Sequence, residues 1–176
     1  MQTKEKILTA SRGLFNRYGY RNVTMRQIAA EVGISPGNLT YYFRHKADIV
    51  TALMDISFEK TYLAEPIETF EDLMLQFGRM LQTIRTNAFF FLDDELGGGP
   101  NEHSGTIRRH LSDGMANLTQ KGIFRETFTP ELRKTVLDML LMTHMTWVRF
   151  AVRGGLEMTA EELLDAHRTI FLPYLA

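Results

Sequence analysis

The sequence predicts an all-α protein, with an N-terminal three-helix head that contains a helix-turn-helix and a C-terminal helical body. Three observations lead to this fold class. Apolar residues recur at helical spacing along the chain, without the alternation that is typical of strands. Proline and glycine stand at the joints between these segments. Residues 24–46 also hold two short helix signals separated by one glycine, which is the pattern of a helix-turn-helix.

The first helix of this motif is predicted to start after Thr24, whose side-chain oxygen can cap a helix that has its apolar residues on one face. Gly33 ends this helix, where the chain needs a left-handed backbone. Ser35 and Pro36 form a second start signal, because a capping residue followed by a residue with fixed φ and no amide suits a first helical turn. The recognition helix is therefore predicted to begin at Pro36.

A recognition helix of this kind lies in the major groove of DNA with its leading side chains against the base edges. Its exposed candidates are Pro36, Gly37, Asn38, Thr40 and Tyr41. Asn38 can pair with adenine, and Thr40 can meet the methyl group of thymine. Tyr41, Tyr42 and Lys46 suit contacts to phosphate, which set register more than sequence. The motif thus predicts double-stranded DNA as a partner.

The charge distribution supports this interpretation. Residues 1–46 hold eight Lys and Arg against two acids, or +6, whereas the remainder holds 12 against 19, or −7. A basic head and an acidic body are expected if only one end of the chain meets a polyphosphate. The alternative, that the two helices are only an αα-hairpin of a core, does not account for this separation.

Residues 4–50 resemble the DNA-binding domain of the TetR (tetracycline-repressor) family of bacterial regulators. The resemblance is carried by an amphipathic first helix with Ile7, Leu8, Leu14 and Phe15, and then by Gly19-Tyr20, Val23-Thr24, Ile28-Ala29, Gly33 to Leu39, Tyr42-Phe43 and Lys46. It implies that Thr24, Arg26 and Tyr42 touch phosphate. It also implies that Asn38, Thr40 and Tyr41 read or flank bases, and that Lys46 anchors the fourth helix. Thr40 stands where many members carry tyrosine, so the operator preference stays open.

The domain prediction is a head at residues 1–46 and a ligand-binding and dimerisation body at residues 47–176. Apolar stripes predict helices from Lys46 to about residue 64, from Ile67 to about residue 87, and over a short stretch from Phe89. A glycine-rich loop at residues 97–100 precedes a helix that ends before residue 122. Pro130 is predicted to open a long helix, and Thr159 to cap the last one.

The long helix after Pro130 predicts a dimer. Residues 139–148 carry no formal charge, and a helix that is apolar all round needs cover from its own core on one side and a second subunit on the other. The last helix adds a related stripe, which gives the predicted interface residues Leu163, His167, Ile170, Phe171 and Tyr174. Together with the resemblance, this pattern implies a homodimer with a four-helix interface and two heads that read a palindrome.

The body also offers residues for a small, largely apolar effector. Twelve phenylalanines and ten methionines can line a cavity or form an ordinary core, and the resemblance implies the cavity. The candidate lining residues are Phe70, Phe77, Met80, Phe90, Met115, Met142 and Trp147. His144 is either a buried histidine with satisfied hydrogen bonds or a hydrogen-bond donor to the ligand.

Other classes of site are not expected. The chain has no cysteine, and the adjacent acids Asp93, Asp94 and Glu95 are interpreted as a solvated surface because a hydrolytic pair needs facing carboxylates. His103 and His110 are seven residues apart and would need further ligands to hold a metal. We therefore expect no catalytic residue, metal or cofactor. With no apolar run near ~20 residues, we also expect no membrane span and a cytoplasmic protein.

These observations predict a dimeric repressor that a small effector releases from a palindromic operator. The alternative is a DNA-bound regulator that recruits another protein and holds no small molecule. An enzyme in the helical body would need a convergent polar site, which the sequence does not display. The effector, the operator, the regulated genes and the choice between repression and activation stay open.

Overall fold

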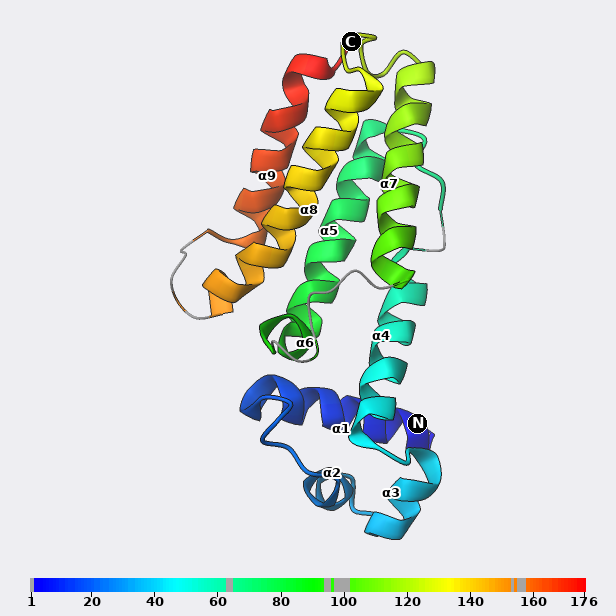
Figure 1. Cartoon of the computed structure of the whole chain (residues 1–176), viewed down its shortest axis with the longest axis vertical. Helices are drawn as coiled ribbons and strands as arrows, with labels where there is room; N and C mark the ends of the chain where they lie inside the picture. Colours follow the sequence, from blue (N-terminus) through cyan, green and yellow to red (C-terminus); the bar gives the residue numbers. More distant parts are fainter. Residues whose placement is uncertain (1, 63–64, 94–95, 97–101, 153, 155–157) are drawn as a thin grey trace. The chain divides into compact units, whose positions relative to one another are not determined.

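The computed structural model describes residues 2–62, 65–93, 96, 102–152, 154 and 158–176 (Figure 1). Within these residues the chain forms nine α-helices and one short 3-10 helix. An isolated β-bridge joins Phe124 and Leu175, and the described residues contain no longer strand. The predicted all-α fold class is therefore confirmed.

The chain divides into two compact units. The head unit consists of Met1–Glu59 and Asn87–Gly97, and the body unit consists of Lys60–Thr86 and Gly98–Ala176. The head unit holds α1 (Thr3–Tyr18), α2 (Met25–Val32), α3 (Pro36–Tyr42), most of α4 (Lys46–Tyr62) and α6 (Ala88–Leu92). The body unit holds α5 (Phe70–Thr86), α7 (Glu102–Gln120), α8 (Pro130–Val152), α9 (Ala160–Phe171) and the 3-10 helix Leu172–Tyr174. The compact unit around the helix-turn-helix is thus larger than residues 1–46, and a domain boundary at residue 46 stays a prediction.

The predicted order of helices agrees with the structure. Helix α8 begins at Pro130, and the Thr159 hydroxyl caps α9 by accepting a hydrogen bond from the Glu162 amide at 3.2 Å. The short helix predicted from Phe89 is α6, which begins one residue earlier. The predicted loop at residues 97–100 lies outside the described residues.

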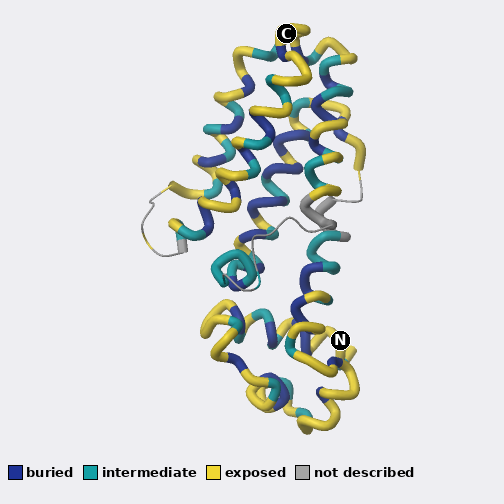
Figure 2. Tube along the Cα trace, viewed as in Figure 1, coloured by how far each residue is buried: buried dark blue, intermediate teal, exposed yellow. Residues whose placement is uncertain are grey.

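The head unit has one hydrophobic core. Its helices contribute side chains that are almost fully buried, among them Ile7, Phe15, Ile28, Leu39, Phe43, Ile49, Leu53 and Phe89. Because the contributions come from α1 to α4 and from α6, none of these short helices has to be stable alone. Figure 2 shows buried and exposed stretches alternating along the helices, as expected when each helix buries one face.

In the body unit, α5, α7, α8 and α9 run side by side (Figure 1). The core at one end is aromatic: Phe124, Phe128 and Phe171 are fully buried, with 5.6 Å between the ring centroids of Phe124 and Phe171. Tyr174 stacks on Phe128 at 4.2 Å, and its carbonyl accepts a hydrogen bond of 2.8 Å from the Arg125 amide. These contacts attach the end of the chain to the connection between α7 and α8.

Helix α7 comes very close to the segment that precedes α5. A Cβ atom added at Gly114 would lie 2.7 Å from the Cβ of Ile67 and would also overlap its Cδ1. Ile67 is buried, and its carbonyl accepts a hydrogen bond of 2.9 Å from the Asn117 side chain, so this segment is held in place. Only glycine fits at position 114.

This close approach gives a stability prediction. We expect Gly114→Ala to lower the free energy of unfolding by about 1–3 kcal/mol, because the added methyl group overpacks a held contact. Gly105→Ala on the same helix is the matched control: it has nothing within 4 Å and gains helix propensity, so it should be neutral or stabilising by up to about 1 kcal/mol. Urea unfolding measures both, and equal stabilisation by the two variants would contradict the assigned contact.

Candidate functional site

The start of α2 is fixed by a capping box. The Thr24 hydroxyl accepts a hydrogen bond from the Gln27 amide at 3.3 Å, and the Gln27 side-chain oxygen accepts one from the Thr24 amide at 2.8 Å. Reciprocal bonds of this kind satisfy two amides that have no partner inside the helix. The predicted cap at Thr24 is confirmed.

The turn between α2 and α3 depends on Gly33. Its φ of +74° and ψ of 34° lie in the left-handed region, which costs glycine little because it has no Cβ. The next amide, that of Ile34, returns to the carbonyl of Ala29 at 3.0 Å. The Ser35 hydroxyl then accepts a hydrogen bond from the Asn38 amide at 3.1 Å, and Pro36 occupies the first turn of α3. The helix-turn-helix predicted from these residues is therefore present.

Helix α3 has one buried face and one exposed face. Leu39 is fully buried against a core that includes Ile28 and Ala29 of α2. The exposed residues are Pro36, Gly37, Asn38, Thr40, Tyr41 and Tyr42. All the leading side chains predicted to face DNA are thus accessible in the head unit.

The exposed side chains differ in what they can offer a duplex. The Thr40 hydroxyl donates to the carbonyl of Pro36 at 2.9 Å, which leaves its methyl group for an apolar contact. The Asn38 side chain forms no hydrogen bond among the described residues, so both its donor and its acceptor are available. Tyr41 is 84% exposed and packs edge-on against Tyr42. Contacts of these residues with bases or phosphates remain predictions.

Lys46 has a structural role that the sequence did not reveal. Its ammonium group donates to the carbonyls of Tyr20 at 2.5 Å and Val23 at 2.8 Å, and lies 4.0 Å from the centroid of the Tyr20 ring. Burial lowers the pKa of Lys46, and the nearby Asp93 carboxylate partly offsets this effect. A phosphate contact by Lys46 stays a prediction and has to compete with these bonds.

Other cations of the head unit are open to solvent. Lys4, Lys6, Arg17, Arg26 and Arg44 are exposed. Arg26 lies in the first turn of α2 and forms no ion pair within the described part of the chain. Arg21 lies 3.6 Å from the carboxylate of Asp93. Arg26 is therefore better placed than Lys46 for the predicted contact to phosphate.

Helix α6 packs on the helices of the head unit. The Phe89 amide donates to the Asn16 side chain at 3.0 Å, the rings of Phe89 and Phe15 are 5.1 Å apart, and the Asn87 side chain donates to the Ser57 hydroxyl at 3.0 Å. Phe90, which we predicted to line the effector pocket, belongs to this unit and packs against its core. Phe90 thus belongs to a different compact unit from the other predicted lining residues.

The structure places most of the remaining predicted lining residues inside the body unit. Phe77, Met80, Met115 and Trp147 are buried, Phe70 is half-buried, and Met142 is 63% exposed. Two hollows among the described residues of the body unit are lined mainly by other residues. One of about 290 Å³ is lined by residues 66–68 and by His110, Asp113, Gly114 and Asn117. An effector pocket lined by the predicted residues stays a prediction.

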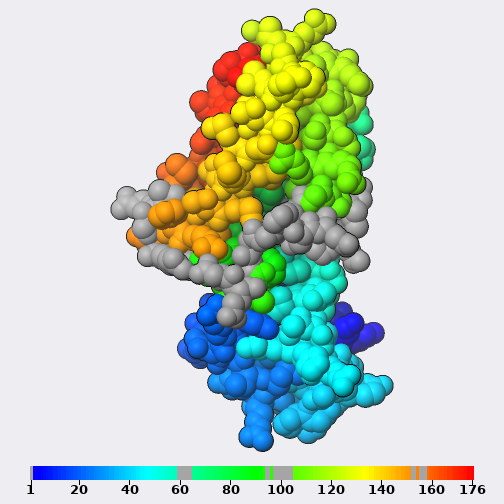
Figure 3. Space-filling model, viewed as in Figure 1, coloured from blue at the N-terminus to red at the C-terminus, as the bar shows by residue number. Residues whose placement is uncertain are grey.

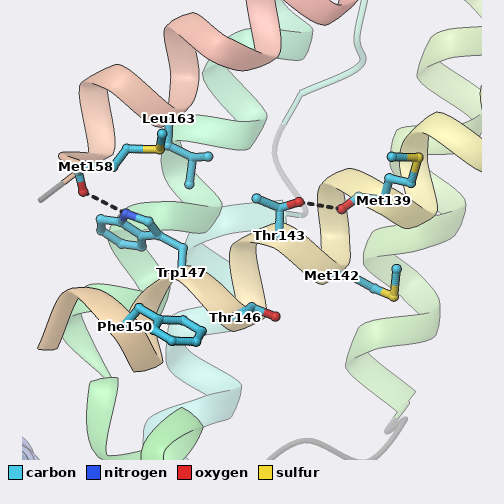
Figure 4. Close-up of a pocket in the computed structure, with 8 residues that line it drawn as sticks. All are labelled: Met139, Met142, Thr143, Thr146, Trp147, Phe150, Met158 and Leu163. Atoms are coloured by element: carbon cyan, nitrogen blue, oxygen red, sulfur yellow. Dashed lines mark hydrogen bonds between the residues drawn. The ribbon is translucent and has the colours of Figure 1, made fainter. Parts of the chain in front are cut away.

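The larger hollow, of about 350 Å³, opens on the surface of α8 (Figure 4). Its lining residues are Met139, Met142, Thr143, Thr146, Trp147, Phe150, Met158 and Leu163. Trp147 is held across it by a hydrogen bond of 2.9 Å from its indole nitrogen to the carbonyl of Met158. Only Met142 and Trp147 of the predicted lining contribute to this hollow.

The surface of α8 is unusually apolar. Met139, Met142 and Phe150 are each more than half exposed. In Figure 3, atoms of α8, coloured yellow to orange, form much of the visible surface of the body unit. The predicted interface residues Leu163, His167 and Phe171 are instead buried within the chain, and Tyr174 stacks on Phe128. The predicted interface is corrected accordingly: of that set, Ile170 is the exposed residue, and the outward face of α8 is the larger apolar surface.

Two imidazoles meet inside the body unit. His144 of α8 and His167 of α9 are buried, with 4.6 Å between ring centroids, and His144 stacks on Phe77 of α5 at 5.5 Å. Burial, together with the neighbouring His167, lowers the pKa of His144 to about 3, and burial lowers that of His167 to about 4. Both rings are therefore neutral at pH 7. His144 is buried as predicted, but its Nε2 atom has no hydrogen-bond partner, and His167 was not expected inside.

The pair predicts a loss of stability in mild acid. Unfolded histidines bind protons near pH 6.5, but the folded pair does not, so its full contribution is present above pH 6.5 and declines as the pH falls. As the pH falls from 6.5 to 5, each of the two histidines should lower the free energy of unfolding by about 1–2 kcal/mol. Urea unfolding over pH 5–8 should show a shallower pH dependence for His167→Phe than for the unmodified chain. Parallel curves would contradict the assigned environment.

The described residues contain no group of three or more His, Asp or Glu side chains placed to hold a metal ion. Of the predicted acidic cluster, Asp93 pairs with Arg21, while Asp94 and Glu95 lie outside the described residues. Among the helices that the structure describes, none has the length and apolarity needed to cross a membrane.

Comparison with known proteins agrees with this geometry. A model of the family described as "Bacterial regulatory proteins, tetR family" matches residues 7–53. The HTH-type transcriptional regulator UidR of Escherichia coli (strain K12) is 24% identical over 153 residues, which cover 80% of this chain and 76% of UidR.

Solved structures extend the likeness to the whole chain. A TetR-family transcriptional regulator from Marinobacter aquaeolei VT8 superposes with a TM-score of 0.79 and 28% identity, covering 100% of this chain and 92% of that one. AibR, solved in complex with isovaleryl coenzyme A and operator DNA, shares the fold with a TM-score of 0.67 at 17% identity, covering 99% and 100% of the two chains. The matched residues 7–53 include the capping box, the Gly33 turn and the exposed face of α3. Residues 7–53 thus match the TetR family of bacterial regulatory proteins, and the whole chain is similar in fold to TetR-family transcriptional regulators.

Proposed function

We propose that this regulator is a dimeric repressor that binds a palindromic operator and is released by a small, largely apolar effector. The observation that carries the DNA half of the proposal is the exposed leading face of α3 on a head with an excess of positive charge. A recognition helix presented in this way fits the major groove. A cytoplasmic location, where bacterial operators lie, follows from the same proposal.

Within this proposal, Asn38 reads a base. Its amide group is free and can form the bidentate pair with adenine. Asn38→Ala should therefore cost roughly 1–3 kcal/mol on the preferred operator and relax the preference at one base pair. Binding sites selected from random duplexes, followed by affinity measurements on single-base variants, test this expectation.

Arg26→Ala is the matched comparison, because Arg26 is exposed in the same motif and is proposed to contact phosphate. Arg26→Ala should weaken binding to all DNA sequences alike and reduce the slope of log affinity against log salt concentration by about one. Asn38→Ala should leave that slope unchanged. An equal loss on every base variant with Asn38→Ala would remove the base-reading role.

The proposed homodimer uses the apolar surface of α8 that includes Met139, Met142 and Phe150, with Ile170 of α9. Exposed apolar patches of this kind mark interaction sites, and a two-fold axis would bring the same patch of two chains together. Two heads related by that axis would meet half-sites about one helical turn apart or more. A dimer therefore explains why α8 has an apolar face on the outside, and its two heads would bind a palindromic operator.

A charge placed in this surface should separate the subunits. Met142→Arg is expected to lower the molar mass in solution from twice that of one chain to that of one chain, because an interface cannot easily desolvate an unpaired charge. Operator affinity should fall with it. Light scattering after gel filtration measures the mass.

Two controls accompany the Met142 variant. Met142→Leu keeps the surface apolar, and Gln82→Arg adds the same charge at an exposed position of α5 that does not line the hollow. Both should remain dimeric. A dimeric Met142→Arg protein would show that α8 is not the interface.

The effector is proposed to act from the body unit. The chain passes between the units after Glu59, after Thr86 and after Gly97, so α4 and α6 link them covalently. Helix α6 is fixed to the head unit by the contacts of Phe89 with Phe15 and Asn16. A ligand that binds one arrangement of the body more tightly would shift the population of head spacings through these links. AibR, which was solved with both a thioester ligand and operator DNA, offers a precedent within the same fold.

One observation favours the alternative regulator that recruits a protein and holds no small molecule. Phe77, Met80 and Met115 of the predicted lining are buried, and neither of the two hollows described above is lined by them. Titration with small apolar probes separates the two functions, because only the effector-controlled repressor should bind them in the body and lose operator affinity as a result.

A further inference from the structure

The pair of buried imidazoles is not used by any part of the proposal above. His144 and His167 are 0% and 1% exposed and belong to different helices. Phe77 contacts both rings, with centroid distances of 5.5 Å to His144 and 5.4 Å to His167. The three rings therefore form one cluster between α5, α8 and α9.

The hydrogen bonds of the cluster are incomplete. The Nδ1 atom of His144 lies 2.8 Å from the carbonyl of Leu140, and since a carbonyl can only accept, Nδ1 carries the proton. The Nε2 atom of a neutral His144 in this tautomer is then an acceptor; it is buried and has no donor, because the backbone carbonyl of Phe77 near the ring can only accept. His167 has no partner on either ring nitrogen, so its N–H and its lone pair are both unpaired. Two unpaired acceptors and one unpaired N–H donor therefore lie next to each other in an apolar surrounding.

This arrangement opposes stability. Buried polar groups in folded proteins are nearly always paired, and each unpaired one lowers the stability of the folded chain. Two phenylalanines of similar shape would fill the same space without that cost. Neutral rings also make the site unsuited to an anion, because Nε2 of His144 cannot donate to a carboxylate.

We propose that His144 and His167 bind the hydroxyl group of an uncharged, otherwise apolar effector, such as a phenol or an alcohol. The ligand O–H donates to Nε2 of His144, and its oxygen accepts the N–H of His167. This inference rests on the effector half of the proposed function and adds the chemical class of the ligand. A hydrocarbon would leave both histidines unpaired, so the pair selects against it.

The hollow of Figure 4 lies beside the helical turns that carry the pair. Trp147 and Leu163 line it, and they lie three residues after His144 and four residues before His167 respectively. Its volume of about 350 Å³ can hold the apolar part of a small ring compound, and because Met139, Met142 and Phe150 line it, a ligand in it would lie within the surface proposed to join two subunits. For the hydroxyl group to reach the imidazoles, Trp147 or Leu163 has to move aside. Trp147 is the single tryptophan of the chain, so its fluorescence reports on this step.

Two probes of the same shape test the inference. 4-Methylphenol and 1,4-dimethylbenzene differ by a hydroxyl in place of a methyl group, and both are titrated into the full chain while Trp147 fluorescence and the melting temperature are followed. We expect a Kd roughly tenfold lower for 4-methylphenol, since the hydroxyl satisfies groups that are otherwise unpaired. 4-Methylbenzoate should bind more weakly than the phenol.

Variants connect the preference to the pair. His144→Phe and His167→Phe should each abolish the difference between the two probes, whereas His110→Gln, a histidine of α7 outside the cluster, should retain it. If a phenylalanine variant does not fold, 15N chemical shifts of the imidazoles in the unmodified chain provide the second measurement. The Nε2 resonance of His144 should shift on addition of 4-methylphenol and stay unchanged with 1,4-dimethylbenzene.

Equal affinities for the two probes, no binding of either, or an unchanged Nε2 resonance would overturn the inference. Operator binding and molar mass are measured on the same samples. These two measurements test the proposed repressor independently of the ligand inference. A dimer that binds its operator but ignores 4-methylphenol refutes the role of the histidines alone. A chain that does neither refutes the proposed repressor itself.

Discussion

One ammonium group connects two parts of the head unit that are distant in sequence. Lys46 begins α4, yet it donates to two carbonyls of the connection between α1 and α2 and lies over the ring of Tyr20. The start of α4 is therefore fixed to that connection by one side chain. Helix α3, which ends four residues before Lys46, is only seven residues long and could not hold its orientation by itself. The exposed face with Asn38 and Tyr41 therefore depends on the tertiary contacts of the head unit, among them those of the buried Leu39.

Local rules were sufficient to predict the elements of the head. The caps at Thr24 and Ser35 and the left-handed turn at Gly33 depend on interactions within a few residues, and the structure contains each of them. The bonds of Lys46 span 23 and 26 residues, and no spacing in the sequence signals them. The sequence therefore predicted where the helices begin and which face of α3 is exposed, but not the bonds that fix the start of α4.

The body was less predictable because its long helix lacks a polar face that could indicate its orientation. With no charge between Met139 and Val148, periodicity could not separate the side that packs inward from the side that faces solvent. The aromatic contacts of α9 decide this, since Phe171 packs on Phe124 and draws His167 and Leu163 inward with it. For this reason several residues that the sequence analysis assigned to the interface, Leu163, His167 and Phe171, are buried within the chain.

The body unit reverses the usual distribution of polarity at two places. Histidines with unpaired nitrogens lie inside, while Met142 and Phe150 of α8 face outward. Each reversal opposes the stability of an isolated chain, since one leaves polar groups without partners and the other leaves apolar area in water. Leu163 and Trp147 line the exposed hollow and lie one helical turn from the two histidines, so both reversals occur in the same part of α8 and α9. Met139, Met142 and Phe150 line this hollow and also belong to the surface proposed to join two subunits, so a ligand that pairs with the imidazoles and occupies the hollow would couple effector binding directly to the dimer interface.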